Sequence, residues 1–588
     1  MKMITGSNQK FIFLNNIAAI ICLVTFFFFL LSYVVIHTRP LLPIIETRYT
    51  SIAWEMWINH QYIFPLQNGL PYSDKPPFLF WIILAGWHLW GVNEWWPRII
   101  PTIFAFFDAI LLSTIAGLLW PQRKEIHLSC FILLLGSFAF IIYANLVLFD
   151  LILIFWLLIA LYSLFKIYFE KNNYFWGSFA LGVGLGLLTK GPIILPFILI
   201  PSVLLPRFIP LEEKIKHYYW LLLISTLVGI AIVLSWAIPA AYLAGPAFAK
   251  SIFFSQSLGR IVPHHHLVHH AHFKSFFWYF KFLPFYLAPW FLFLPFYTQW
   301  KKLKIHNDKP LQFVITIILI CFLMLCLIGG KQIHYLLPLL PFTILVIANL
   351  SNSNFDISSK SLWLFNLTFF LFGLFLCLPS LMNIFLGQTT ELISIPPSTG
   401  YLIMGYGFIL FFLECSDSVR AQLYMTLNSL ILITFLYVYV IHVNYKAFDL
   451  KPLAEFISNL QQKNYPVGYL GEYQDQLHFM GKLLKPISSV EKNKITTWAK
   501  NNQNGWLILN PTQTTQYTRR LSSSGFVAAT RCSHTQCMLR CEIEHAPRQL
   551  LEIRRVYTAK IEKFFYQGQI IGVISANTIL NSSSHHKS

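Results

Sequence analysis

The chain has 588 residues, of which 56% are hydrophobic and 11% charged, and its mean hydropathy is +0.58. Soluble domains carry about 25% charged residues, so the composition excludes an ordinary soluble protein and indicates a polytopic membrane protein. The formal charge of +19 does not indicate nucleic-acid binding, because no separate basic domain or recognition motif accompanies it.

About thirteen apolar segments are long enough to span a bilayer, which takes roughly 17–25 helical residues. They lie near residues 11–36, 98–119, 127–147, 150–169, 174–190, 192–208, 218–243, 281–300, 311–329, 335–350, 361–384, 400–415 and 422–444. The first is too long for a signal-peptide core and should remain as a spanning helix. The segment 78–92 is short and interrupted by His88, so we expect it to lie on the membrane without crossing it.

The basic loop residues predict the orientation of these spans. With the N-terminus in the cytoplasm, most of them fall in the inward loops 122–125, 166–173, 207–217, 301–309, 351–360 and 416–422, as the positive-inside preference requires. The outward parts are then the loop 37–97, the surroundings of Asp150, the loops 244–280 and 330–334, and everything after residue 445.

The outward loop 37–97 holds a dense cluster of charge between two apolar segments. Glu46, Arg48, Asp74 and Lys75 lie in it, and charge beside a bilayer is costly unless it sits at the water edge or lines a polar cavity. Because Pro76 restricts residue 75 to an extended backbone, the direction of the Lys75 ammonium group is limited. This loop is therefore a candidate site.

A second outward loop, 244–280, holds six histidines between residues 264 and 272. Such density indicates a borderline cation such as zinc. Most of these histidines are expected to be solvated or to bind metal adventitiously.

The amino-acid composition changes after residue 445, where charged residues become frequent and the apolar runs become short. Residues 466–470 and 505–509 are typical of strands, and 451–462 has helical apolar spacing. We expect a membrane domain over 1–445, a small α/β domain over 446–576 and a disordered end over 577–588. The tail also holds three cysteines, Cys532, Cys537 and Cys541, two of which could pair in an oxidising compartment.

Several separated motifs occur in a fixed order along the membrane half. They are Glu46-Thr47-Arg48-Tyr49, the stretch NGLPYSDKPP at 68–77, Asp150, Thr189-Lys190-Gly191, the stretch 272–290 and the stretch 330–338. Together they resemble the ArnT-like, polyprenyl-phosphate-sugar-dependent glycosyltransferases, relatives of the protein O-mannosyltransferases. The resemblance implies an α-helical GT-C type membrane fold with a C-terminal extracytoplasmic domain, and transfer of a sugar from a lipid phosphate.

Glycosyl transfer needs a carboxylate that takes the acceptor proton, and the resemblance implies Glu46 or Asp150 as catalytic residues. The family has an acidic pair before Thr-Arg-Tyr, whereas Ile45 precedes Glu46 here, so the family's principal catalytic carboxylate is missing. Two structural interpretations stay open. Asp150 could be a helix N-terminal residue favoured by the dipole, and Glu46 could form an ion pair with Arg48 or another basic residue.

The departing phosphate needs positive charge or a metal ion. Arg48, Lys75 and Lys331 together would form a cationic pocket, and Tyr335 matches a family tyrosine near the lipid phosphate. Asp74 matches the acid of the family's Glu-Lys-Pro-Pro motif, a metal ligand.

His272 matches the second ligand by its distance from Pro289-Trp290. A Zn²⁺ or Mg²⁺ ion between Asp74 and His272 would neutralise the phosphate. Thr189-Lys190-Gly191 lacks the GxxxxGK pattern of a nucleotide site.

The sequence therefore predicts a metal-assisted glycosyltransferase of the bacterial inner membrane, with its active site and C-terminal domain in the periplasm. It would move a sugar from undecaprenyl phosphate to lipid A, another envelope glycan or a protein. Two alternatives remain. Ile45 could mark a catalytically degenerate protein that binds lipid-linked sugar, and a transporter of lipid-linked sugar would show inverted repeats or broken helices in paired positions.

Overall fold

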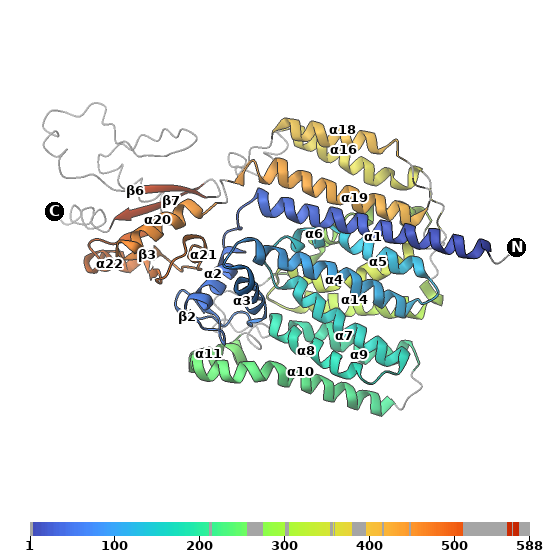
Figure 1. The fold of residues 1–588 in the computed structure, drawn as a ribbon, viewed down its shortest axis with the longest axis horizontal. Helices are drawn as coiled ribbons and strands as arrows, with labels where there is room; N and C mark the ends of the chain where they lie inside the picture. The colour runs from blue at the N-terminus through green and yellow to red at the C-terminus, as the bar shows by residue number, and fades with distance from the viewer. Residues whose placement is uncertain are drawn as a thin grey trace.

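A computed structural model describes most of the chain. The described residues are 4–210, 215–255, 274–299, 305–352, 355, 357, 359–378, 396–413, 415, 417–445, 449–509, 561–566 and 569–575. Long helices run roughly side by side in a bundle, and the short helices and the sheet gather at one end of it (Figure 1). The first helix, α1 (Ile4–Thr38), begins at the opposite end.

Apolar helices make up the bundle. They are α1, α4 (Trp95–Leu119), α5 (Lys124–Gly136), α6 (Phe138–Ala144), α7 (Asp150–Glu170), α8 (Phe175–Lys190), α9 (Leu195–Phe208), α10 (Ile215–Ala244), α14 (Lys309–Leu327), α15 (Leu340–Ser351), α16 (Trp363–Cys377), α18 (Pro397–Leu410) and α19 (Ser418–Leu436). Among the described residues, eight helical stretches are long and apolar enough to cross a membrane, or nine if the bent pair α5–α6 is one span. The expected polytopic helical fold is confirmed.

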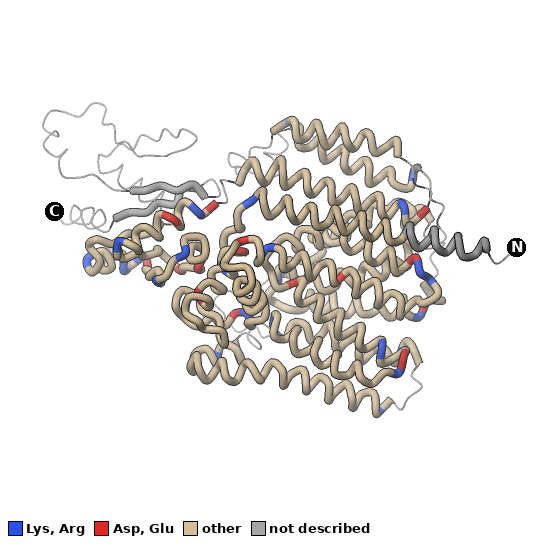
Figure 2. The backbone as a smooth tube through the Cα atoms, in the orientation of Figure 1, with Lys and Arg blue, Asp and Glu red and all other residues tan. Residues whose placement is uncertain are grey.

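Charged residues are sparse along the bundle and gather at its two ends and in the C-terminal region (Figure 2). An apolar middle between charged ends is the pattern of helices that cross a bilayer, because ionised groups are costly in the hydrocarbon.

The expected span at 281–300 is not a single helix. The structure has four short helical pieces in its place: η3 (Phe276–Phe282), α12 (Leu283–Leu287), η4 (Trp290–Leu292) and α13 (Pro295–Thr298). Pro284, Pro289 and Pro295 explain the interruption, because proline removes a backbone donor and clashes with the preceding turn.

This irregular stretch packs against the break between α5 and α6, where the two helices meet at 62°. The Phe138 backbone N–H donates to the Ala288 carbonyl at 3.1 Å, and Trp290 Nε1 donates to Ser137 Oγ at 2.8 Å. Each irregular segment thus satisfies polar groups of the other, as backbone at membrane depth requires.

The loop 37–97 folds into α2 (Thr47–Ile58), a small hairpin of β1 (Leu66–Gln67) and β2 (Leu70–Pro71), and α3 (Phe78–Trp90). The 13 residues of α3 span about 20 Å at 1.5 Å per residue, which is short of a hydrocarbon core of about 30 Å. The helix buries Phe80, Ile83 and Trp87 and lies with α2 at the end of the bundle (Figure 1). These observations agree with the expectation that 78–92 does not cross.

The C-terminal region contains helices α20 (Lys451–Gln462), α21 (His478–Gly481) and α22 (Ile495–Asn501) and strands β3 (Val467–Leu470), β4 (Ser488–Val490), β5 (Trp506–Leu509), β6 (Ile561–Tyr566) and β7 (Gln569–Ser575). The strands form one sheet in the order β4-β3-β5-β7-β6. β3 pairs in parallel with β4 and β5, whereas β7 pairs antiparallel with β5 and β6. The predicted strands at 466–470 and 505–509 and the helix at 451–462 are confirmed.

This region packs on the outward loop through α21. Phe479 stacks on Trp87 with 5.2 Å between ring centroids and 6° between planes. The Phe479 backbone N–H donates to Ser51 Oγ at 3.0 Å, and Trp54 Nε1 donates to the Leu483 carbonyl at 2.9 Å. The loop and the C-terminal region therefore form one continuous cap at this end of the bundle.

Candidate functional site

The first residue of α7, Asp150, forms an ion pair with the last residue of α8. Asp150 Oδ1 lies 2.5 Å from Lys190 Nζ, and the two side chains are 3% and 6% exposed. The helix dipole favours both, an acid at an N-terminus and a cation at a C-terminus. The Lys190 ammonium group also lies 5.5 Å from the ring centroid of Tyr335, so the pair brings one predicted site residue next to another.

The site extends into the outward loop, where Arg48 and Tyr49 lie. Arg48 Nη2 donates to the Tyr49 hydroxyl at 3.3 Å, and its guanidinium carbon lies 5.1 Å from the Tyr49 ring centroid. Burial raises the pKa of Tyr49, with Arg48 opposing the shift and the negative charges of Asp150 and Asp74 adding to it. Tyr49 is therefore close enough to interact with both carboxylates, and it connects the loop to the Asp150–Lys190 pair.

Asp74 and Lys75 lie at the surface of the same loop. Asp74 is exposed and interacts electrostatically with Arg48. Lys75 is half-buried, and its Nζ donates to the Asp74 carbonyl at 3.2 Å. The structure thus brings together four residue positions that the sequence predicted separately, namely Arg48, Asp74, Asp150 and Tyr335.

Glu46 is fully buried, and its carboxylate is engaged on both oxygens. Arg39 Nη1 and Nη2 donate to Oε2 and Oε1, the Leu42 N–H donates to Oε2 at 2.8 Å, and the Val147 N–H donates to Oε1 at 3.0 Å. Burial alone would raise the pKa of Glu46, but Arg39 outweighs it and the pKa is lowered. The ion-pair interpretation is therefore favoured over that of a proton acceptor, with Arg39 as the partner.

Lys331 is also buried, in the turn between α14 and η7 (Ile333–Leu339). Its Nζ donates to the carbonyls of Lys274 and Ile328, and burial lowers the pKa of its ammonium group. In this arrangement Lys331 fixes the turn that carries Tyr335, and its predicted contact with phosphate stays a prediction. His272 lies outside the described residues, as do Cys532, Cys537 and Cys541.

Sequence reasoning missed several residues of the site. Tyr143 and Tyr286 both lie near enough to Asp150 to interact with it electrostatically. Lys190 was noted only as part of the motif Thr189-Lys190-Gly191, and no role was assigned to it. A signal for Lys190 existed, because a carboxylate in a membrane segment needs a cationic or polar partner.

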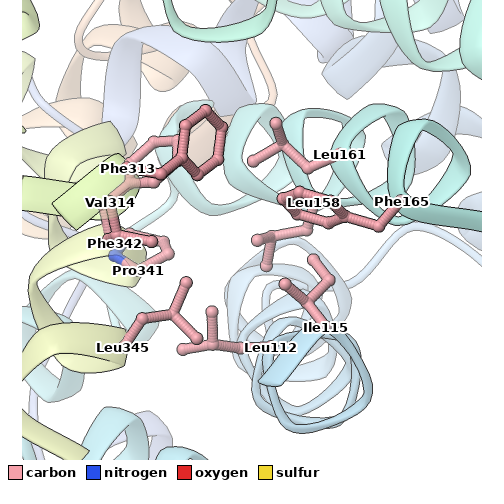
Figure 3. A pocket seen from close by; sticks show the side chains of 10 residues that line it. All are labelled: Leu112, Ile115, Leu158, Leu161, Phe165, Phe313, Val314, Pro341, Phe342 and Leu345. Atoms are coloured by element: carbon pink, nitrogen blue, oxygen red, sulfur yellow. The ribbon is translucent and has the colours of Figure 1, made fainter. Parts of the chain in front are cut away.

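A small cavity lies inside the bundle, away from these polar groups. Its lining is entirely apolar and comes from α4, α7, α14 and α15 (Figure 3): Leu112, Ile115, Leu158, Leu161, Phe165, Phe313, Val314, Pro341, Phe342 and Leu345. Leu158 lies about two helical turns beyond Asp150 along α7, so the polar site is at the end of the bundle and the cavity is deeper within it.

Comparison with known proteins shows which proteins this chain is similar to. A family profile described as "Dolichyl-phosphate-mannose-protein mannosyltransferase" matches residues 57–244. The chain is 28% identical over 379 residues to the undecaprenyl phosphate-alpha-4-amino-4-deoxy-L-arabinose arabinosyl transferase of Wigglesworthia glossinidia brevipalpis, over 62% of this chain and 63% of that protein. It is 27% identical to the transferase of the same name from Aeromonas hydrophila subsp. hydrophila, over 55% of this chain and 58% of that one. The chain thus spans about three fifths of the length of these relatives.

The fold is similar over nearly the whole chain. The crystal structure of ArnT from Cupriavidus metallidurans bound to undecaprenyl phosphate superposes with a TM-score of 0.65 and 14% identity, over 94% of this chain and 97% of that one. The apolar helices and these relatives support a multi-pass inner-membrane protein. The resemblance is therefore confirmed: the chain is similar to ArnT proteins in sequence and has the GT-C type membrane fold.

Proposed function

We propose that this chain is an inner-membrane glycosyltransferase that moves a sugar from undecaprenyl phosphate to lipid A, another envelope glycan or a protein on the periplasmic side. The observation that supports this most is the Asp150–Lys190 ion pair beside Tyr335 and Tyr49. An acid and cations at the end of an apolar bundle are what transfer from a lipid phosphate needs. The names of the relatives favour 4-amino-4-deoxy-L-arabinose as the sugar.

Three cations are available for the donor phosphate in this proposal. Arg48 offers a planar fork that matches phosphate oxygens, while Lys75 and Lys190 offer compact ammonium groups. Lys331 would reach the phosphate only by leaving its two backbone carbonyls. We therefore assign the main phosphate contacts to Arg48 and Lys190, with Lys75 at the rim.

Asp150 takes the acceptor proton in this proposal. The acceptor oxygen forms a bond to the anomeric carbon, the bond from that carbon to the phosphate oxygen breaks, and undecaprenyl phosphate leaves with the bonding electrons. Lys190 turns from Asp150 to the arriving phosphate, which frees a carboxylate oxygen as base. The ion pair thus keeps the base neutralised until the donor is bound.

A divalent metal ion fits the exposed carboxylate of Asp74. Asp74 lies near enough to Arg48 and Tyr49 to interact with both electrostatically, and His272 is the proposed second ligand. Zn²⁺ or Mg²⁺ held there would supply positive charge for the leaving phosphate.

The test is transfer by the purified full chain in lipid nanodiscs, with undecaprenyl-phosphate-linked 4-amino-4-deoxy-L-arabinose and lipid A, and detection of the product by mass spectrometry. Asp150→Asn should lower the rate at least about 100-fold, as expected for loss of a general base. Glu170→Gln is the matched control, because Glu170 ends the same helix and pairs with Lys166 at an exposed position. Equal rates for Asp150→Asn and wild type would remove Asp150 from the mechanism.

A second candidate function is binding of lipid-linked sugar without transfer. Ile45 is 45% exposed whereas Glu46 is fully buried, so an acid at position 45 would face outward and Glu46 does not take its place. A binding protein would retain the donor lipid and show no transfer, and Ile45→Asp would then be expected to create activity. Transfer by the wild-type chain would exclude this candidate.

A further inference from the structure

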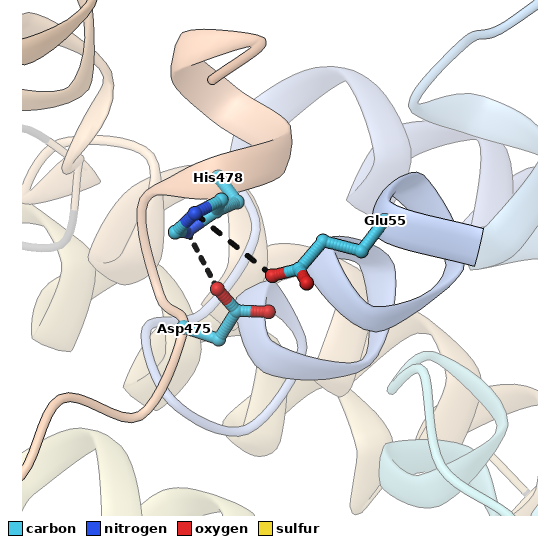
Figure 4. Close-up of side chains that lie close together, drawn as sticks. All are labelled: Glu55, Asp475 and His478. Atoms are coloured by element: carbon cyan, nitrogen blue, oxygen red, sulfur yellow. Dashed lines mark ion pairs between the residues drawn. The ribbon is translucent and has the colours of Figure 1, made fainter. Parts of the chain in front are cut away.

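Three ionisable side chains meet where α21 docks on α2, away from the site described above (Figure 4). Glu55, Asp475 and His478 are 3%, 0% and 2% exposed. One ligand atom from each lies within 4.8 Å of the other two. Glu55 belongs to the outward loop and the other two to the C-terminal region, so the cluster straddles their interface.

Several atoms of this cluster are buried without a hydrogen bond. Asp475 Oδ1 pairs with His478 Nδ1, but among the described residues Asp475 Oδ2 has no hydrogen-bond partner, and neither does His478 Nε2. Asp475 Oδ1 lies 2.5 Å from His478 Nδ1, and His478 Nε2 lies 3.9 Å from Glu55 Oε1. A separation of 3.9 Å is too long for a hydrogen bond, and buried polar atoms without partners call for a water or an ion.

The distances suit a bridging metal ion. Zinc binds histidine nitrogen and carboxylate oxygen at about 2.0–2.2 Å in tetrahedral geometry, which puts two ligand atoms about 3.3–3.6 Å apart. His478 Nε2 and Glu55 Oε1 lie 3.9 Å apart, so they need to approach each other by only a few tenths of an ångström. A divalent cation would also compensate the negative charge of carboxylates at this depth, because buried charge without compensation is costly.

The ligand side chains are held in place before any metal binds. Glu55 accepts from the backbone N–H groups of Asn68 at 2.6 Å and Gly69 at 2.7 Å, in the hairpin turn where both residues have positive φ, 52° and 78°. His478 Nδ1 lies 3.0 Å from the Tyr473 hydroxyl, which accepts from the Leu477 N–H at 3.0 Å. Such outer hydrogen bonds are typical of ligands that are oriented for a metal.

We propose that Glu55, Asp475 and His478 bind a Zn²⁺ ion that fastens the C-terminal region to the outward loop. The histidine favours zinc over Mg²⁺ or Ca²⁺, which take oxygen ligands. This site is distinct from the proposed Asp74–His272 metal, and it does not depend on the proposed sugar transfer.

The experiment counts zinc in the full chain purified in detergent. The six histidines between residues 264 and 272 are first replaced by alanine, so that neither they nor the Asp74–His272 pair contribute. After incubation with Zn²⁺ and desalting, this parent protein should retain about one zinc per chain by mass spectrometry of the metal. His478→Ala and Glu55→Gln should lose it, and His60→Ala should keep it, since His60 is an exposed histidine at the end of α2.

A second measurement separates binding from folding. Zn²⁺ should raise the Tm of the parent and of His60→Ala, and should leave the Tm of Glu55→Gln unchanged. Glu55→Gln keeps the side-chain shape and an amide oxygen for the hairpin turn, so it is expected to elute as a monodisperse folded protein. Zinc retained equally by His478→Ala and His60→Ala, or no zinc retained by the folded parent, would overturn the proposal.

Discussion

Replacing Lys190 by methionine tests whether the buried ion pair with Asp150 governs both stability and function. Methionine keeps an unbranched side chain of similar length but removes the charge. Asp150 would then be an uncompensated carboxylate at a position that is only 3% exposed. The expected result is a large loss of folding stability.

The expected loss of folding stability follows from the burial of the Asp150–Lys190 pair. Removing one partner of a buried ion pair costs about 3–5 kcal/mol. Asp150 begins α7, and the helix dipole offsets about 1 kcal/mol of the cost of leaving an acid there. We therefore expect Lys190→Met to lower the free energy of unfolding by about 2–4 kcal/mol.

The assay is reversible unfolding in mixed detergent micelles, followed by tryptophan fluorescence. The double variant Asp150→Asn with Lys190→Met should recover most of the lost stability, because no unpaired charge remains. Lys166→Met is the matched control at the other end of α7, where Nζ lies 2.6 Å from Glu170 and the side chains are 20% and 46% exposed. Exposed pairs at this spacing contribute about 0.3–0.5 kcal/mol.

The reasoning fails if Lys190→Met costs no more than Lys166→Met. It also fails if the double variant is no more stable than Lys190→Met alone. In either case the charges near Asp150 would be compensated by another group, and the pair would not be the element that holds α7 to α8.

Three further predictions concern other buried groups. The pKa of Glu46 is lowered by Arg39, so its contribution to stability is present above the unfolded pKa and lost as pH falls through the folded one; Glu46→Gln should therefore flatten the decline of Tm below about pH 4.5. Phe479→Ala removes the ring stacked on Trp87 and should cost about 3–5 kcal/mol, measured as faster protease cleavage between the membrane half and the C-terminal region. Asp108 is fully buried in α4, and both of its carboxylate oxygens lack a hydrogen-bond partner among the described residues. Because a buried polar group without a partner is costly, Asp108→Leu should raise the Tm without lowering the rate of transfer. A loss of transfer would instead assign Asp108 a functional role.

The bundle was predictable because apolar runs long enough to cross a bilayer leave few alternatives to a helix. The short length of 78–92 likewise allowed the expectation that it does not cross. Pro284, Pro289 and Pro295 signalled the interruption at 281–300, but the high apolarity of this segment led to the expectation of a spanning helix. Composition alone does not distinguish a straight spanning helix from an irregular stretch that packs against a bent pair of helices, as this one packs against α5 and α6.

The contacts of the site were harder to predict, because they join distant parts of the chain. Asp150 and Lys190 lie at opposite ends of two consecutive helices, and only the antiparallel packing of α7 and α8 brings them together. Glu55 and His478 are separated by most of the chain. Their contact depends on how α21 docks on α2, and no periodic pattern in the sequence reports that docking.

The absence of an acid at position 45 limits how the protein could carry out transfer. Glu46 could replace it only if the start of α2 shifted by one residue, but the Glu46 carboxylate accepts four hydrogen bonds, from Arg39, Leu42 and Val147. A shift would break a buried ion pair, which costs about 3–5 kcal/mol, and would leave Arg39 buried without a partner. The loop is therefore held in a register in which Ile45 faces outward and Glu46 faces the bundle. If transfer is measured, the acceptor proton must go to another carboxylate, and Asp150 is the one that already lies beside a cation able to move to the donor phosphate.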